Sequence, residues 1–378
     1  MPFGFGKKHE KAGIDWPQPS FAERVRKFWA WFSENEGRIE AFIEGQRQGA
    51  YTPGDVEDFV TFLSSGVGLV SEGIRFNVGG DNEFTFAVSG DDYLHYLLPY
   101  IVGQQPEDLK GKWQFFAGMQ GTGGRDFTLR MDGASAPAEE VFVSMAFEEG
   151  AGKADLRFFV EAVKDRGDED AYRFFYVFME NIIGEALSYT CVRRVDRAEA
   201  REEGMFPLTE LEAKLKDFLL KGEAAPDPAQ SYFLYRMEGD PEGGAPRTDV
   251  FVGRSCYTWI LNAYYDGEGG CFDAFAGCGA TPVFLHWEVD AGRRDPLEER
   301  NALEDALVVA ALGEGDPDRA GVLLGAAMGH ARAYLDILLY DPAAFWEMAK
   351  PVFDALPYPV TMTEFKQRGG SVAVNAAG

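Results

Sequence analysis

The sequence has few of the residues from which metal and thiol sites are built. It contains four cysteines and four histidines in 378 residues. So few cysteines cannot form a disulfide scaffold in a chain of this length, and reduced thiols are typical of a cytoplasmic protein. Six residues separate Cys271 from Cys278, whereas zinc fingers and ribbons place paired ligands about two to four residues apart. We therefore expect neither a metal nor a cofactor.

The common motifs of catalysis and nucleotide binding are also missing. We find no Gly-x-Ser-x-Gly, His-Glu-x-x-His or dinucleotide-binding glycine motif. The glycine-rich segment Gly118–Arg125 resembles a phosphate loop, but it lacks the lysine and the following helix that a phosphate loop uses. We predict that it is a hairpin turn between two strands.

Long apolar runs and positive charge are both scarce. No run approaches about 18 uninterrupted apolar residues, so we expect no transmembrane helix, and the first residues do not resemble a signal peptide. We expect a cytoplasmic protein. Lysine and arginine number 36 against 62 aspartates and glutamates, a formal net charge of −26. This charge disfavours nucleic acids and anionic membranes as partners and favours a basic protein.

What the sequence does contain is a short internal similarity. Residues 184–196 and 329–341 share glycine, alanine, tyrosine and aspartate in register. In each copy a helical pattern precedes the glycine and a strand pattern follows it, so Gly184 and Gly329 are predicted to be left-handed helix caps. The repeat predicts two tandem modules whose repeat strands occupy equivalent central positions.

The order of helix and strand patterns predicts an α+β fold. The pattern Ser20–Glu23 is a capping box that opens a helix, and Thr52 opens a second one. A hairpin is expected around residues 79–82, a strand over 258–264 and a helix from Asp316 to Gly329. The predicted organisation is a tail (1–18), a first module (19–222), a linker (223–228) and a second module (229–378). Each module is expected to have a mainly antiparallel sheet with helices on one face.

Residues 20–220 resemble a group of uncharacterised bacterial cytoplasmic proteins. The segments that carry the resemblance are Phe28–Phe32, Glu83–Gly90, Trp113–Phe116, Ile182–Glu185 and Pro207–Leu211. The resemblance implies no activity and no site residues. Related sequences among toxin-neutralising or partner-binding proteins offer only an analogy.

Two classes of function remain open. The even acidic charge and the missing motifs favour a non-enzymatic protein-binding module, of which a toxin-immunity protein is one example. The alternative is a hydrolase or transferase that uses Cys271, Cys278 or His286 in the second module, with Cys256 and His330 as a further pair. A catalytic thiol needs a lowered pKa and an oriented base, and neither can be read from the sequence. A deep pocket holding a thiol or imidazole beside a carboxylate would favour the enzyme.

Overall fold

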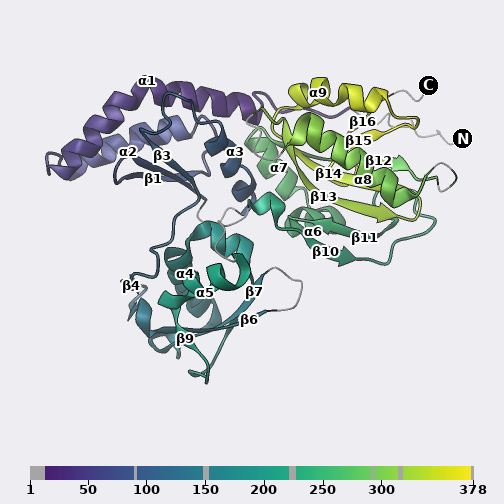
Figure 1. Cartoon of the computed structure of the whole chain (residues 1–378). Helices are drawn as coiled ribbons and strands as arrows, with labels where there is room; N and C mark the ends of the chain where they lie inside the picture. Colours follow the sequence, from purple (N-terminus) through teal and green to yellow (C-terminus); the bar gives the residue numbers. More distant parts are fainter. Residues whose placement is uncertain are drawn as a thin grey trace, which may run out of the picture. The chain divides into compact units, whose positions relative to one another are not determined.

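The computed structural model of the chain describes residues 13–88, 92–147, 153–220, 227–290, 292, 294–313 and 318–375. It contains two compact units (Figure 1). The N-terminal unit is Phe28–Ser231, and the C-terminal unit consists of the residues before Phe28 and after Ser231. The predicted α+β class, with mostly antiparallel sheets, is confirmed. None of the helices in the described residues is both long and apolar enough to cross a membrane.

The predicted tail and linker fall partly outside the described residues. This is true of residues 1–12 of the tail and 223–226 of the linker. Ile14 and Trp16, which belong to the predicted tail, pack against the core of the C-terminal unit. The boundaries of the two predicted modules stay a prediction.

The first part of the N-terminal unit is a three-stranded sheet with two long helices. The first helix begins with the predicted capping box of Ser20 and Glu23, and the second begins at the predicted Thr52, which forms a capping box with Asp55. The strand order is β1-β2-β3, antiparallel for the first pair and parallel for the second. The elements are α1 (Phe21–Arg47), α2 (Pro53–Val67), β1 (Arg75–Gly79), β2 (Glu83–Ala87), η1 (Asp92–Tyr96), α3 (Leu98–Gly103) and β3 (Gln114–Ala117).

Aromatic rings hold this part together. Phe32 of α1 packs edge-on against Phe84 of β2 and Phe115 of β3, with ring centroids 5.6 Å and 5.1 Å away. The Nε1 of Trp29 donates to the carbonyl oxygen of Ile101 at 3.0 Å, which satisfies its buried polar group. α1 therefore covers the face of the sheet on which the β2 phenylalanines lie.

The second part of the N-terminal unit has its own sheet, in the order β8-β7-β6-β9, and a separate hairpin, β4-β5. β7 and β8 run parallel because the long α4 connects them. The elements are β4 (Thr128–Met131), β5 (Ala134–Pro137), β6 (Val141–Phe147), β7 (Ala154–Val160), α4 (Asp168–Cys191), β8 (Val192–Arg197), β9 (Phe206–Pro207), η4 (Leu208–Glu210) and α5 (Leu211–Leu215).

The glycine-rich segment Gly118–Arg125 is not the predicted hairpin, because it joins β3 of one sheet to β4 of another. It crosses α4 where the helix is interrupted at Gly184 (φ 81°, ψ 161°). The amide of Glu185 donates to the carbonyl oxygen of Met119 at 2.9 Å, and the buried Glu185 carboxylate accepts from the Met119 amide at 3.0 Å. The glycines therefore allow the backbones of the two segments to approach each other closely where they cross.

We expect replacement of Gly184 with alanine to lower the free energy of unfolding by about 2 kcal/mol or more, because its backbone conformation is essentially restricted to glycine. A Cβ there would also lie 2.7 Å from the carbonyl oxygen of Met119. Urea denaturation would measure the loss. The control is Gly37→Ala in α1, where nothing lies within 4 Å of the added Cβ and a gain of up to about 1 kcal/mol is expected. Equal effects of the two substitutions would contradict this account.

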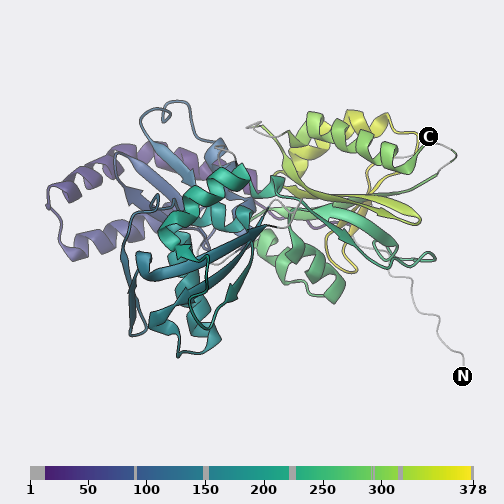
Figure 2. The same ribbon diagram turned by 60° about the horizontal axis from the view of Figure 1, so that its bottom comes forward.

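The C-terminal unit is built on one seven-stranded antiparallel sheet in the order β10-β11-β13-β14-β12-β15-β16. α8 and α9 cover one face, and α6 and α7 lie on the other side (Figures 1 and 2). The elements are β10 (Phe233–Arg236), β11 (Val250–Ser255), α6 (Thr258–Asp266), α7 (Gly270–Gly277), β12 (Thr281–Glu288), α8 (Pro296–Leu307), β13 (Gly321–Gly329), β14 (Arg332–Leu339), α9 (Pro342–Asp354), β15 (Thr361–Glu364) and β16 (Ser371–Ala373).

Three predictions for this unit are wrong: the strand over 258–264, the helix that runs to Gly329, and the left-handed cap at Gly329. Residues 258–264 form a helix, and residues 321–329 form a strand. The predicted helix start at Asp316 lies outside the described residues. Every residue of β13 is buried, and a short apolar run buried on both faces cannot be told from a buried helix by its periodicity. Gly329 accordingly ends a strand in a β-hairpin, without a left-handed φ.

The repeat strands do not occupy equivalent positions. β8 is an edge strand paired in parallel with β7, whereas β14 lies in the centre of its sheet between two antiparallel neighbours. Gly184 does have a positive φ, but helix follows it as far as Cys191. The tandem arrangement of modules therefore stays a prediction that these strands do not support.

Candidate ligand-binding site

The two faces of the seven-stranded sheet differ in chemistry. Along β12, Val283, Leu285 and Trp287 belong to the apolar core shared with α8 and α9. Because side chains alternate along a strand, Phe284 and His286 lie on the opposite face. Their antiparallel partners on β14 are Asp336 and Tyr334. The opposite face therefore carries a carboxylate, an imidazole and a phenol in a part of the chain that is otherwise apolar.

A buried ion pair lies at the centre of this face. Arg247, from the loop between β10 and β11, donates through Nη1 to the Asp336 carboxylate. Both residues are only 1% exposed. The Nε of Arg247 and the Oδ2 of Asp336 are buried and have no hydrogen-bond partner among the described residues. A buried pair with unsatisfied atoms contributes little net stability, which points to a role of this pair beyond folding.

Aromatic rings enclose the guanidinium. Its carbon lies 4.6 Å from the ring centroid of Phe365 and 5.4 Å from those of Phe284 and Tyr334. Burial opposes the charge of Arg247, but the Asp336 carboxylate and the nearby tyrosines outweigh it and raise its pKa. Arg247 is therefore a permanent cation held by aromatic faces and one carboxylate.

Tyrosines of α6 fix the loop that carries Arg247. The Tyr264 hydroxyl donates to the carbonyl oxygen of Pro246 at 3.0 Å, and the Tyr265 hydroxyl to that of Arg247 at 3.2 Å. Burial raises the pKa of both hydroxyls, so they stay neutral donors. These two hydrogen bonds hold the loop in a conformation in which Arg247 has a left-handed φ of 69°.

Asp249 anchors the same loop to the β13–β14 hairpin. Its carboxylate accepts from the amides of Ala331 and Arg332 at 3.0 Å and 2.9 Å and from the hydroxyl of Tyr334. Gly329 leaves the room for it, since a Cβ there would lie 2.2 Å from an oxygen of this carboxylate. The second glycine of the repeat therefore makes space for a buried carboxylate.

A cavity of 980 Å³ opens beside the ion pair. This volume is within the range of small-molecule sites, which is about 300–1,000 Å³. Three elements meet there: the β10–β11 loop, α6 and the loop between β15 and β16. The residues that line it are Met237, Glu238, Ala245, Pro246, Arg247, Thr248, Val250, Tyr264, Tyr265, Phe284, Thr363, Lys366, Gln367, Arg368 and Gly369.

The lining is unusual for so acidic a chain, because cations outnumber carboxylates. Arg247, Lys366 and Arg368 line the cavity against one carboxylate, Glu238. Lys366 forms an ion pair with Glu364 at 3.4 Å, but Arg368 has no ion pair among the described residues. Arg368 also has a left-handed φ, of 59°. Such backbone conformations in large side chains occur preferentially at functional sites.

The structure places the predicted catalytic residues elsewhere. Neither Cys271 nor Cys278 lines the cavity. The Cys271 thiol donates to the Tyr257 hydroxyl at 3.3 Å, and burial raises its pKa, the reverse of what a nucleophile needs. Cys278 is buried, as is Cys256.

The two histidines named with these cysteines also have other surroundings. His286 shares a 3.1 Å hydrogen bond with the hydroxyl of Thr363, which lines the cavity. His286 itself is not among the residues that line the cavity. His330 is exposed and packs on Phe251, with ring centroids 5.0 Å apart. In the described residues, no group of three or more histidines, cysteines and carboxylates is placed to hold a metal ion.

Sequence reasoning missed Arg247, Asp336 and Arg368. One signal was available: Asp336 is the only charged residue in the apolar run from Ala333 to Tyr340. A carboxylate in a central strand requires a cationic or hydrogen-bonding partner. Nothing in the sequence identifies which of the 36 basic residues supplies it.

Comparison with known proteins gives no match to a protein-family model, a curated protein or a solved structure. The comparisons therefore transfer no function to this chain.

Proposed function

We propose that the protein is a non-enzymatic binding protein whose C-terminal unit takes up a small organic anion with a planar apolar part. The observation that carries this proposal is the cationic, aromatic-lined cavity in a chain of net charge −26. An acidic surface repels anions in general, so a hollow with three basic side chains, of which Arg368 has no ion pair among the described residues, favours a specific anionic ligand.

In this proposal the aromatic wall of the cavity contacts the apolar part of the ligand, and Arg368 binds its anionic group. The partly exposed ring of Tyr265 offers a flat apolar contact to the ligand body, and the buried rings of Tyr264 and Phe284 form the wall behind it. Arg368 offers its planar guanidinium to a carboxylate, in the bidentate geometry that such pairs favour. Arg247 is already paired with Asp336, so it holds the wall and leaves Arg368 as the main cation for the ligand. The thiol-based alternative is not favoured, because no cysteine lines the cavity among the described residues.

We expect the cavity to prefer carboxylates over their neutral amides. Isothermal titration calorimetry with benzoate, 4-hydroxybenzoate and indole-3-acetate, each compared with its carboxamide, tests this. Arg368→Gln should weaken carboxylate binding about tenfold or more, since a charge-assisted hydrogen bond contributes about 1.5–3 kcal/mol.

The matched control is Arg236→Gln. Arg236 is an exposed arginine of β10 in the same unit and does not line the cavity. Its loss should leave the affinity unchanged. Equal affinity for acid and amide, an equal loss in the two variants, or no binding of any of the six compounds would contradict the proposal.

A further inference from the structure

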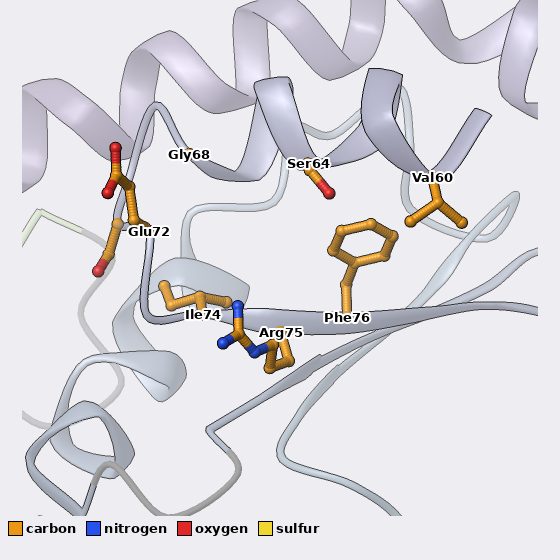
Figure 3. A pocket seen from close by; sticks show the side chains of 8 residues that line it. Val60, Ser64, Gly68, Glu72, Ile74, Arg75 and Phe76 are labelled. Carbon is orange, nitrogen blue, oxygen red and sulfur yellow. The ribbon is translucent and has the colours of Figure 1, made fainter. Parts of the chain in front are cut away.

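A second hollow lies in the N-terminal unit, between α2 and β1. It has a volume of 440 Å³. Figure 3 shows the ring of Phe76 rising from β1 toward Val60 and Ser64 of α2, with Glu72 and Arg75 farther along the groove. Val60 is 47% exposed, although it is a large apolar residue on a helix. The groove therefore presents apolar surface that nothing in the described chain covers.

The floor of the groove is an edge strand. Among the described residues, β1 pairs with β2 on one side and with no strand on the other. Exposed edges are usually shielded by charges, prolines or bulges. β1 has only Arg75, at its first position, and its register with β2 is regular. The backbone groups on its outer side are thus available to pair with an added strand.

The side chains above this edge would receive alternate residues of such a strand. Phe76 and Val78 stand opposite Phe86 and Phe84 of β2 in the antiparallel register, so they lie on the same face of the sheet. Val60 of α2 lies over the same groove. A strand added beside β1 would extend this face, with every second side chain against Phe76 and Val60.

The segment that forms the groove is acidic. Glu72 and Arg75 line the groove itself. From Tyr51 to Val88 the chain has one basic residue, Arg75, against six exposed carboxylates: Asp55, Glu57, Asp58, Glu72, Asp81 and Glu83. Arg47 of α1 pairs with one of them, Asp81, at 2.9 Å. A second copy of this chain would bring the same carboxylates to the edge, and like charges would oppose pairing.

We propose that the edge of β1 and the α2 groove bind an extended segment of a basic partner protein, in which apolar residues alternate with lysine or arginine. The apolar residues enter the groove, the basic residues face the surrounding carboxylates, and the backbone pairs with β1. This surface belongs to the N-terminal unit and does not depend on the ligand proposed for the C-terminal cavity.

Two hexapeptides test this proposal on the full chain: one in which valine and lysine alternate, and one in which valine and glutamate alternate. Fluorescence anisotropy of the labelled peptides should show binding of the lysine peptide and none of the glutamate peptide. Val60→Lys should weaken binding about tenfold or more, because it places a cation in the groove. The lysine peptide should also slow amide hydrogen exchange in Arg75–Gly79.

The matched control is Val309→Lys, which places the same charge at an 88% exposed valine of the C-terminal unit. It should bind the lysine peptide as the wild type does. An equal loss in both variants would reduce the effect to net charge and overturn the proposal. It would also be overturned by binding of the glutamate peptide, by slowed exchange only outside β1, or by self-association through this edge in sedimentation.

Discussion

Replacement of Asp336 with alanine should lower the free energy of unfolding of the C-terminal unit by about 3–5 kcal/mol, because it leaves a buried guanidinium without its carboxylate. Arg247 is 1% exposed, and its remaining side-chain hydrogen bond in the described contacts is to the Tyr235 hydroxyl at 3.3 Å. Amide hydrogen exchange in β12 and β14 measures the loss, since central strands report the opening of the whole sheet.

Two further variants separate the buried charge from the ion pair itself. Removing both partners, as Arg247→Met with Asp336→Leu, should recover most of the stability, since apolar replacements of a buried pair are often neutral. Asp354→Ala breaks an exposed pair with Lys350, whose side chains are 63% and 56% exposed, and should cost less than about 1 kcal/mol. A small change in the free energy of unfolding for Asp336→Ala would mean that water reaches Arg247 and hydrates its charge.

Features set by neighbouring residues could be predicted from the sequence. The capping box at Ser20, the helix start at Thr52 and the hairpin after β1 are confirmed. Each depends on hydrogen bonds and backbone angles within a few residues, such as the left-handed φ of Gly80 and Asn82. Such signals do not depend on how the rest of the chain packs.

Features set by distant contacts could not be predicted. The run Gly321–Gly329 is a strand because β11 and β14 pair with it on both sides. The candidate site has the same difficulty: Arg247 and Asp336 are 89 positions apart. The lone aspartate in an apolar run indicated that a partner exists, but the loop that carries Arg247 has no periodic pattern to place it.

The repeat shows how one pattern can have two physical causes. Gly184 is needed where α4 is interrupted and a second backbone crosses it at Met119. Gly329 is needed because the Asp249 carboxylate lies where a Cβ would be. A glycine in a sequence pattern indicates close approach or unusual backbone angles, and only the structure shows which one applies.

Acidification should destabilise the N-terminal unit through His95, which is 9% exposed. Burial lowers the pKa of this imidazole from an ordinary 6.5 to about 4. Its ring is stacked on Tyr189 with centroids 4.6 Å apart, and Lys153 Nζ lies 5.7 Å from the centroid of the same tyrosine. A proton on His95 would therefore place a second cation against this ring in a poorly hydrated position.

The direction of the effect follows from proton binding. Between pH 6.5 and about 4 the unfolded chain binds a proton at His95 that the folded chain does not. The stability contributed by neutral His95 is thus fully present above pH 6.5 and is lost as the pH falls toward 4. A shift of this size corresponds to about 3 kcal/mol.

Urea denaturation of the wild type and of His95→Phe at pH 7, 5.5 and 4 isolates this contribution, because carboxylates titrate in both proteins. The difference between their free energies of unfolding should move in favour of the variant by about 3 kcal/mol from pH 7 to pH 4. A difference that stays constant over this range would mean that the imidazole is protonated in the folded state, or that water reaches it beside Tyr189.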